Sequence, residues 1–326
     1  KICSFLNFIF YGVSLSLPAF FLLIESNEFK FVENMFLISI YIKYFSFFFL
    51  FLILIVKKKF VIGKIDFNLI QDFKNHSKWM TITGIYNQIY DYIDKHLIKI
   101  NLGSLMLVTY SVPQQLAAKL TIFSQSIIAV LLPRLSLLKS NLEKKKVLSA
   151  NLYFFITIMS FFLIISLPFF DEILSWWLKK SYSDDLLKLF KIFISLTFLS
   201  CVSSIIISFY ESRMFAKINT RYETIAIIPF IIGLIICVYL KNIFAFAILL
   251  FLKEFVLILV RAFSIKNYIV NFIYFILYLF IFITAFVFSI LGQDSLSLIV
   301  SFLLLILLLV KIPYDLILKE FYKIKG

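Results

Sequence analysis

Several chemical features that a soluble enzyme needs are scarce or missing in this sequence. Only 15% of the 326 residues are charged, whereas a soluble domain carries about a quarter. The two histidines, His76 and His96, are isolated, and the cysteines, Cys3, Cys201 and Cys237, form no CxxC pair or His/Cys cluster. There is also no Ser/His/Asp set and no Gly-rich phosphate loop, so we expect neither an enzyme nor a metal or cofactor site.

Hydrophobic residues, in contrast, are abundant. They make up 62% of the chain, and its mean hydropathy is +1.02. A hydrocarbon core about 30 Å thick needs roughly 20 apolar residues per helical span. The sequence therefore predicts an all-α polytopic membrane protein with about ten transmembrane helices. We expect these spans at 4–24, 35–56, 79–99, 107–133, 152–170, 187–209, 224–240, 243–260, 268–290 and 295–312.

The basic residues between the spans fall mainly on alternate sides. Loops on one side, at 57–78, 134–146, 213–221, 261–266 and the two chain ends, carry 21 Lys or Arg residues. Loops on the other side carry five, namely Lys30, Lys99, Lys179, Lys180 and Lys241. The positive-inside rule then predicts that the first side and both termini are cytoplasmic. The formal net charge of +14 belongs to these loops, so we expect no nucleic-acid partner.

Four segments are expected along the chain. Residues 1–56 are predicted to end an N-terminal helical bundle with two spans, and 57–78 to form a basic cytoplasmic linker. Residues 79–262 then form a six-helix bundle, and 263–326 add two spans and a short cytoplasmic tail. Apolar residues within 57–78 are compatible with an amphipathic surface helix or with a solvated loop. On the outer side, Trp176 and Trp177 fit interfacial anchors better than a substrate-stacking site.

Span 79–99 carries polar residues at helical spacing, which places them on one stripe. The stripe contains Gly84, Asn87 or Gln88, Asp91, and Asp94 or Lys95. A charge in hydrocarbon costs at least about 2.5 kcal/mol, so this stripe is expected to face protein or water. Asp91 follows Lys78 by 13 residues, or about 20 Å of helix, which puts it in the outer half of the membrane.

Span 107–133 carries a second polar set that includes Gln114, Gln115 and Lys119. Lys119 is expected about 18 Å from the outer end of the span, near the midplane, where an adjacent antiparallel span can bring it close to Asp91. Pro113 is predicted to kink this span, and Pro133 to end it.

Charged residues inside the other spans complete the candidate site. Lys188 and Lys191 are expected to extend to the outer interface. Lys43 and Lys253 join Lys95 and Lys119 as lysines inside the spans, which are rare without a reason. Several lysines converging on a wet cavity would attract an anion such as a pyrophosphate, although a paired buried ion explains any single one equally well. The predicted cavity residues are Lys43, Asn87, Gln88, Asp91, Asp94, Lys95, Gln114, Gln115, Lys119 and Lys253.

Residues 84–138 contain a recognisable series of motifs. The series runs from Asp94-Lys95 through a short glycine-containing outer loop to Tyr110-Ser111, and it ends at 133–136 in Pro-Arg-Leu-Ser. This series resembles the Wzx-type O-antigen flippases, the polysaccharide-transporter branch of the multidrug/oligosaccharidyl-lipid/polysaccharide exporter superfamily. The outer segment with Trp177 and Tyr182 is also similar to that family, and the resemblance extends diffusely over most of the chain.

The resemblance implies a fold and an activity. Members have twelve to fourteen spans in two bundles, so if 79–99 is the seventh span, about four N-terminal spans are missing here. The implied function is to flip an undecaprenyl-pyrophosphate-linked oligosaccharide across the bacterial inner membrane by alternating access. Further expected partners are membrane lipids and other polysaccharide-assembly membrane proteins.

The resemblance also implies roles for the candidate residues. The four lysines would attract the pyrophosphate, and the amides of Asn87, Gln88, Gln114 and Gln115 would bind sugar hydroxyls. Asp91 or Asp94 would carry a coupling proton or sodium ion.

Two other classes of function stay open. A drug or cation antiporter of the same superfamily should have an acidic, aromatic cavity, which the excess of lysines disfavours. An O-antigen polymerase should have a large outer loop with arginines, but the longest predicted outer loop, 171–186, has none. A polyprenyl glycosyltransferase should have acidic metal-binding motifs, and the one candidate, Ser183-Asp184-Asp185, is typical of a solvated turn.

Overall fold

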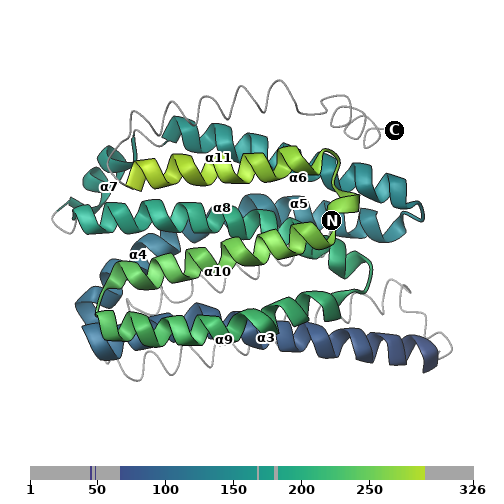
Figure 1. Ribbon diagram of the computed structural model, residues 1–326, viewed down its shortest axis with the longest axis horizontal. Coiled ribbons are helices and arrows are strands. Elements are labelled where there is room, and N and C mark those ends of the chain that lie inside the picture. Colours follow the sequence, from purple (N-terminus) through teal and green to yellow (C-terminus); the bar gives the residue numbers. More distant parts are fainter. Residues whose placement is uncertain (1–44, 46–47, 49–66, 167–168, 180–182, 291–326) are drawn as a thin grey trace. The chain divides into compact units, whose positions relative to one another are not determined.

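The computed structural model describes residues 45, 48, 67–166, 169–179 and 183–290, and Figure 1 shows its helices with the labels used below. The chain divides into two compact units, Lys1–Ile70 and Gln71–Gly326, and all that follows concerns the second. Every regular element in the described residues is helical. The helices are α3 (Phe67–Leu102), α4 (Ser104–Ala118), α5 (Thr121–Leu137), α6 (Asn141–Ser166), α7 (Phe170–Leu178), α8 (Asp184–Ser212), α9 (Ala216–Leu240), α10 (Ile243–Ser264), the 3₁₀ helix η3 (Lys266–Tyr268) and α11 (Phe272–Ile290).

Four stretches of the described chain are long and apolar enough to cross a membrane. They are Ser104–Leu137, Asp184–Ser212, Ala216–Leu240 and Ile243–Ser264, and a shorter apolar stretch, Phe272–Thr284, lies in α11. The predicted all-α polytopic membrane class is therefore confirmed. Predicted spans 4–24 and 295–312 lie outside the described residues, as do the span 35–56 except for residues 45 and 48 and the whole of the segment 57–66 that begins the expected linker.

Helix α8 is the centre of this unit, because it contacts α4, α5, α6, α7, α9, α10 and α11. Its start is set by Ser183, whose side chain accepts a hydrogen bond from the Leu186 backbone N–H (3.3 Å), and by two aspartates in the first turn. Both features stabilise a helix N-terminus. Aromatic packing joins α8 to its neighbours. The centre of the Phe198 ring lies 3.7 Å from the ring centre of Phe282 in α11 and 6.1 Å from that of Phe155 in α6.

Helices α9 and α10 form a tight hairpin. Lys241 ends α9 with a left-handed backbone (φ 51°), and the Asn242 side chain then caps α10 by accepting from the Phe244 N–H (2.9 Å). The two helices approach closely at Gly233, where an added Cβ would lie 2.4 Å from a methyl carbon of Leu249. Gly233 thus has a packing role, unlike Gly84 and Gly103, where an added Cβ would meet no atom within 4 Å.

The predicted span 107–133 contains a local 3₁₀ turn. Lys119 and Leu120 keep right-handed helical φ and ψ, but their N–H groups bond to the carbonyls of Leu116 and Ala117 three residues earlier. This turn, which we call the break, separates α4 from α5 within one apolar stretch, Ser104–Leu137. Pro113 lies inside α4, and Pro133 lies inside α5, which continues to Leu137. The expectation that Pro133 ends this span is therefore wrong.

Candidate functional site

The predicted polar stripe of α3 is largely uncovered by the described residues. Asn87, Gln88 and Asp91 are all exposed. Asp91 lies within electrostatic range of Lys95 and Lys253, but it forms no ion pair within 4 Å in the described part of the chain. The expected Asp91–Lys119 contact is thus not made in this conformation.

A groove of about 500 Å³ runs along the same helix toward its C-terminal end. It brings together two predicted cavity residues, Gln88 and Lys95, with the further basic residue Lys99. Lys95 is half-buried, and its ammonium lies 5.6 Å from the centre of the Tyr92 ring. The groove therefore combines an amide, two lysines and an aromatic ring in one place.

Asp94 differs from its neighbours on the stripe because it is completely buried. Its Oδ2 accepts a hydrogen bond from the Tyr110 hydroxyl (2.6 Å), and its Oδ1 accepts one from the Lys95 backbone N–H (2.7 Å). The Tyr110 ring packs edge-on against Phe193 of α8 at 5.0 Å. Asp94 thus ties α3 to α4, and the Asp-Lys and Tyr-Ser motifs meet through this bond.

The polar residues of α4 lie at and before the break in that helix. Lys119 and Gln115 are exposed, and Gln114 is half-buried with an Oε1 that has no hydrogen-bond partner among the described residues. Just after the break, the Thr121 hydroxyl donates to the Ala118 carbonyl (2.7 Å), which is one of the acceptors that the interrupted helix leaves free. Lys119 is therefore an exposed cation beside irregular backbone.

We call the exposed residues Asn87, Gln88, Asp91, Gln115 and Lys119 the open polar face. They lie on α3 and at the end of α4. A charged group at membrane depth avoids lipid. Since α4 belongs to a stretch that is apolar enough to cross a membrane, we expect Gln115 and Lys119 to border water or protein.

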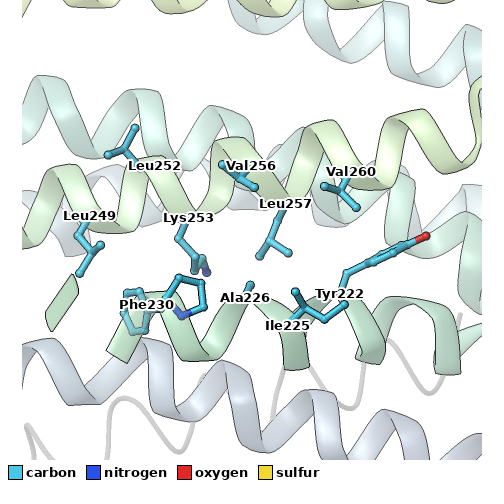
Figure 2. Close-up of a pocket in the computed structure, with 11 residues that line it drawn as sticks. Tyr222, Ile225, Ala226, Phe230, Leu249, Leu252, Lys253, Val256, Leu257 and Val260 are labelled. Atoms are coloured by element: carbon cyan, nitrogen blue, oxygen red, sulfur yellow. The ribbon is translucent and has the colours of Figure 1, made fainter. Parts of the chain in front are cut away.

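Lys253 lies elsewhere, on α10, and its ammonium is already engaged. The Nζ atom is 3.3 Å from Glu254 Oε2 and 3.9 Å from the centre of the Tyr90 ring. Figure 2 shows the side chain extending from α10 toward α9, at a groove of about 570 Å³ whose other described lining residues carry no charge. Lys253 is thus a paired cation in apolar surroundings.

A buried ion cluster, which we did not predict, joins α8, α9 and α10. Arg261 is only 1% exposed. Its guanidinium donates to Glu223 Oε1, to the Ser203 hydroxyl and to Asn219 Oδ1 (2.9 Å), and it lies 3.6 Å from Glu254 Oε1. The Tyr210 hydroxyl donates to the Arg261 backbone carbonyl at 3.0 Å. The five residues Ser203, Asn219, Glu223, Glu254 and Arg261 therefore hold the three helices together.

The cluster corrects two assignments made from hydropathy. Arg261 was counted among the loop cations, and Glu223 fell just before the span expected at 224–240. Both helices continue past the apolar stretches, so both side chains lie inside the bundle. The spacing of Glu254 and Arg261 could have indicated this. They are seven residues apart, which places them on the same face of a helix. Lys191 is a similar case: it is 7% exposed and donates to the Ser289 carbonyl (3.1 Å), whereas it was expected at the interface.

Lys43 lies outside the described residues, and no group of three or more potential metal ligands occurs within the part that the structure describes. The remaining site predictions divide into three environments. The open polar face is exposed, Asp94 and Lys253 are engaged in buried or half-buried contacts, and Lys95 and Gln114 are half-buried without an ion pair in the described residues.

Comparison with known proteins yields two matches. Residues 36–172 match a family described as "Polysaccharide biosynthesis protein". A Shigella flexneri protein named "Putative O-antigen transporter" is 23% identical over 153 residues, which is 47% of this chain and 37% of the relative. The match thus spans little more than a third of that protein's length. No solved structure gives a significant match. Both matches agree with the resemblance of this sequence to the Wzx-type polysaccharide transporters.

Proposed function

We propose that this chain is part of a flippase that moves a polyprenyl-pyrophosphate-linked oligosaccharide across the bacterial inner membrane, with both chain ends in the cytoplasm. The open polar face on α3 and α4 is the observation that carries the proposal. A zwitterionic or anionic headgroup needs a hydrated, cationic path, while the lipid tail can stay in the bilayer. An exposed aspartate, an exposed lysine and three exposed amides on membrane-depth helices would provide the lining of that path.

The break between α4 and α5 supports a site at Lys119. A stretch of 3₁₀ geometry inside a long helix often marks a functional position. Lys119 directly follows the last residue of α4. A cation at this position would attract the pyrophosphate near the midplane, and Lys95 would hold the same group in the groove nearer the end of α3.

The structure also suggests how the remaining roles divide. Amides donate and accept hydrogen bonds, so Asn87, Gln88 and Gln115 suit sugar hydroxyls. Of the two aspartates, Asp91 is exposed and Asp94 has both carboxylate oxygens occupied. We therefore assign ion coupling to Asp91 and a positioning role to Asp94.

Thiol labelling tests whether water reaches this face. Single cysteines replace Asp91 or Lys119 in a chain whose three native cysteines are changed to serine, and intact cells are treated with a water-soluble maleimide. We expect both sites to react. A cysteine at the exposed turn residue 241 is the positive control, and one at the fully buried Ile205 is the negative control. Reaction at 241 alone would show that the face is dry and would overturn the proposal.

Complementation tests the substrate. Lys119→Ala and Asp91→Ala variants, matched in membrane abundance to the unmodified protein, are expressed in a flippase-null strain, and surface O-antigen is measured. We expect both to lose it. Full restoration of surface polysaccharide by both variants would remove these residues from the transport path.

A further inference from the structure

Helices α3 and α9 meet along a polar seam. The Thr220 hydroxyl lies 2.8 Å from that of Thr83 and 3.0 Å from the Trp79 backbone carbonyl. One turn further, the Thr224 and Tyr86 hydroxyls are 3.2 Å apart. Residue numbers rise together on both helices, so the helices run parallel and their N-terminal portions lie at the same end of the bundle. Figure 1 shows α3 and α9 one beside the other.

Two lysines share one indole ring at this end. The ammonium of Lys78 on α3 lies 5.7 Å from the centre of the Trp79 ring, and that of Lys217 on α9 lies 5.6 Å from it. Lys74 and Arg221 each lie four residues from one of these lysines, so each shares its helix face. All four cations are exposed. We call Lys74, Lys78, Lys217 and Arg221, with Trp79, the basic seam.

The basic seam makes no ion pair in the described part of the protein, although the Glu211 carboxylate of α8 lies within electrostatic range of His76 on α3. None of its four cations lies within 4 Å of a described carboxylate. The first turn of α9 contains no acidic residue, and Glu223, two residues beyond Arg221, is committed to Arg261. Like charges gathered around one ring repel each other, and an anion that binds between them would relieve that repulsion.

The residues that flank the basic seam are apolar and exposed. Phe73 is 72% exposed, and Met214 and Phe215, just before α9, are 66% and 41% exposed. On α9, Ile225 follows Arg221 by one turn and is 70% exposed. This combination is typical of helix ends in the lipid headgroup layer. There, apolar side chains contact the acyl chains, lysines reach the aqueous phase, and tryptophan lies at the boundary between them.

We propose that the basic seam binds the headgroup of an anionic phospholipid, with the phosphate among the four cations and the acyl chains beside the apolar residues of α9. The choice of a phospholipid follows from the position, because the seam lies where the apolar length of α9 begins and its flanking side chains reach into lipid. Each lysine or arginine near an anionic membrane surface contributes about 1 kcal/mol, or about a fivefold change in binding. This site does not depend on the transported substrate.

Bromolipid quenching tests the proposal at Trp79 itself. The full chain, with Trp176→Phe and Trp177→Phe so that Trp79 is its only tryptophan, is placed in phosphatidylcholine vesicles that contain dibrominated phosphatidylglycerol or dibrominated phosphatidylcholine. We expect the phosphatidylglycerol to quench Trp79 more strongly at equal mole fraction. The ratio of Trp79 quenching by phosphatidylglycerol to quenching by phosphatidylcholine should decrease as salt is raised. In Lys78→Gln/Lys217→Gln this ratio should fall toward one, by up to about fivefold for each lysine removed.

Two controls separate this site from a general preference for anionic lipid. A chain with Trp177 as its only tryptophan reports on α7, which precedes the start of α8, whereas the basic seam lies near the end of α8. Trp177 should be quenched equally by the two brominated lipids. Lys139→Gln/Lys146→Gln removes two exposed cations from the loop before α6 and the start of that helix, and it should leave the Trp79 preference unchanged. Equal quenching by both lipids would overturn the proposal, as would an equal loss of preference in the two lysine pairs. A Trp79 emission change caused by inorganic pyrophosphate, without a preference for phosphatidylglycerol, would assign the seam to a pyrophosphate instead.

Discussion

The open polar face of α3 and α4 and the buried ion cluster of α8, α9 and α10 use similar residues in opposite surroundings. In the ion cluster, Arg261 bonds to three side chains and lies beside a fourth, and it is almost completely buried. On the open polar face, Asp91 and Lys119 are exposed and make no ion pair in the described residues. The contrast separates charge that protein surrounds, which is architectural, from charge that is left open, to which we assign the proposed function. The following variants test that division, in order of their expected effect on stability.

Removal of Arg261 should have the largest effect. In Arg261→Ala, the Glu223 and Glu254 carboxylates lose their shared partner inside the bundle. We expect a loss of about 3–5 kcal/mol in the free energy of unfolding, because a buried charge is left uncompensated. The measurement is the denaturation midpoint of the purified full chain in detergent.

A double variant separates lost charge balance from lost packing. In Arg261→Met/Glu223→Met, Glu254 keeps Lys253 as its partner, so this protein should be more stable than Arg261→Ala. If Arg261→Ala unfolds at the same midpoint as the unmodified chain, the ion cluster does not hold the helices together.

The bond between Tyr110 and Asp94 should come second. Tyr110→Phe keeps the ring against Phe193 but removes the donor to a buried carboxylate. We expect a loss of about 1–2 kcal/mol, measured in the same way. Tyr239→Phe is the matched control, since Tyr239 is 88% exposed and its midpoint should not move.

Lys253 should matter less. In Lys253→Met, Glu254 still faces Arg261, so the expected loss is about 0.5–1 kcal/mol from the contact with the Tyr90 ring. Tyr90→Leu removes the same contact from the other side. The two losses should therefore not add in the double variant, and strict additivity would mean that the ammonium does not interact with the ring.

Lys119 should have the smallest effect on stability. Lys119→Ala removes an exposed side chain that makes no ion pair with the described residues, so the free energy of unfolding should change by no more than about 0.5 kcal/mol, while transport is lost. Lys241→Ala, in the exposed α9–α10 turn, should preserve both. A strongly destabilised Lys119→Ala protein would place Lys119 with the architectural charges and end the distinction between the two regions.

The sequence predicted the membrane class and the helices of the described region well, because apolar length and the alternation of basic loops report directly on the bilayer. It could not predict the ion cluster. Glu223 and Arg261 lie just beyond the apolar stretches, where hydropathy alone places a loop, and only the packing of three helices shows that they are inside. The break at Lys119 was likewise hidden, since Pro113 was the stronger local signal and a proline is tolerated within α4.

The assignment of site residues could be made only in part for the same reason. Helical spacing placed Asn87, Asp91 and Asp94 on one stripe, and Asp91 is indeed exposed. A turn of the helix later, Asp94 is buried against Tyr110, since which part of a stripe is covered depends on the neighbouring helix. Sequence spacing gives the face of a residue, but tertiary packing decides whether that face is open.

The packing around α8 has a mechanical consequence. The hairpin of α9 and α10 is locked to α8 by the ion cluster and closes through a two-residue turn, so these three helices should move as a rigid block. Helices α4 and α5, which meet at the 3₁₀ turn of Lys119–Leu120, both pack against the same α8. Lys119 should therefore keep its place relative to this block, so that a transported headgroup would move past a fixed cation.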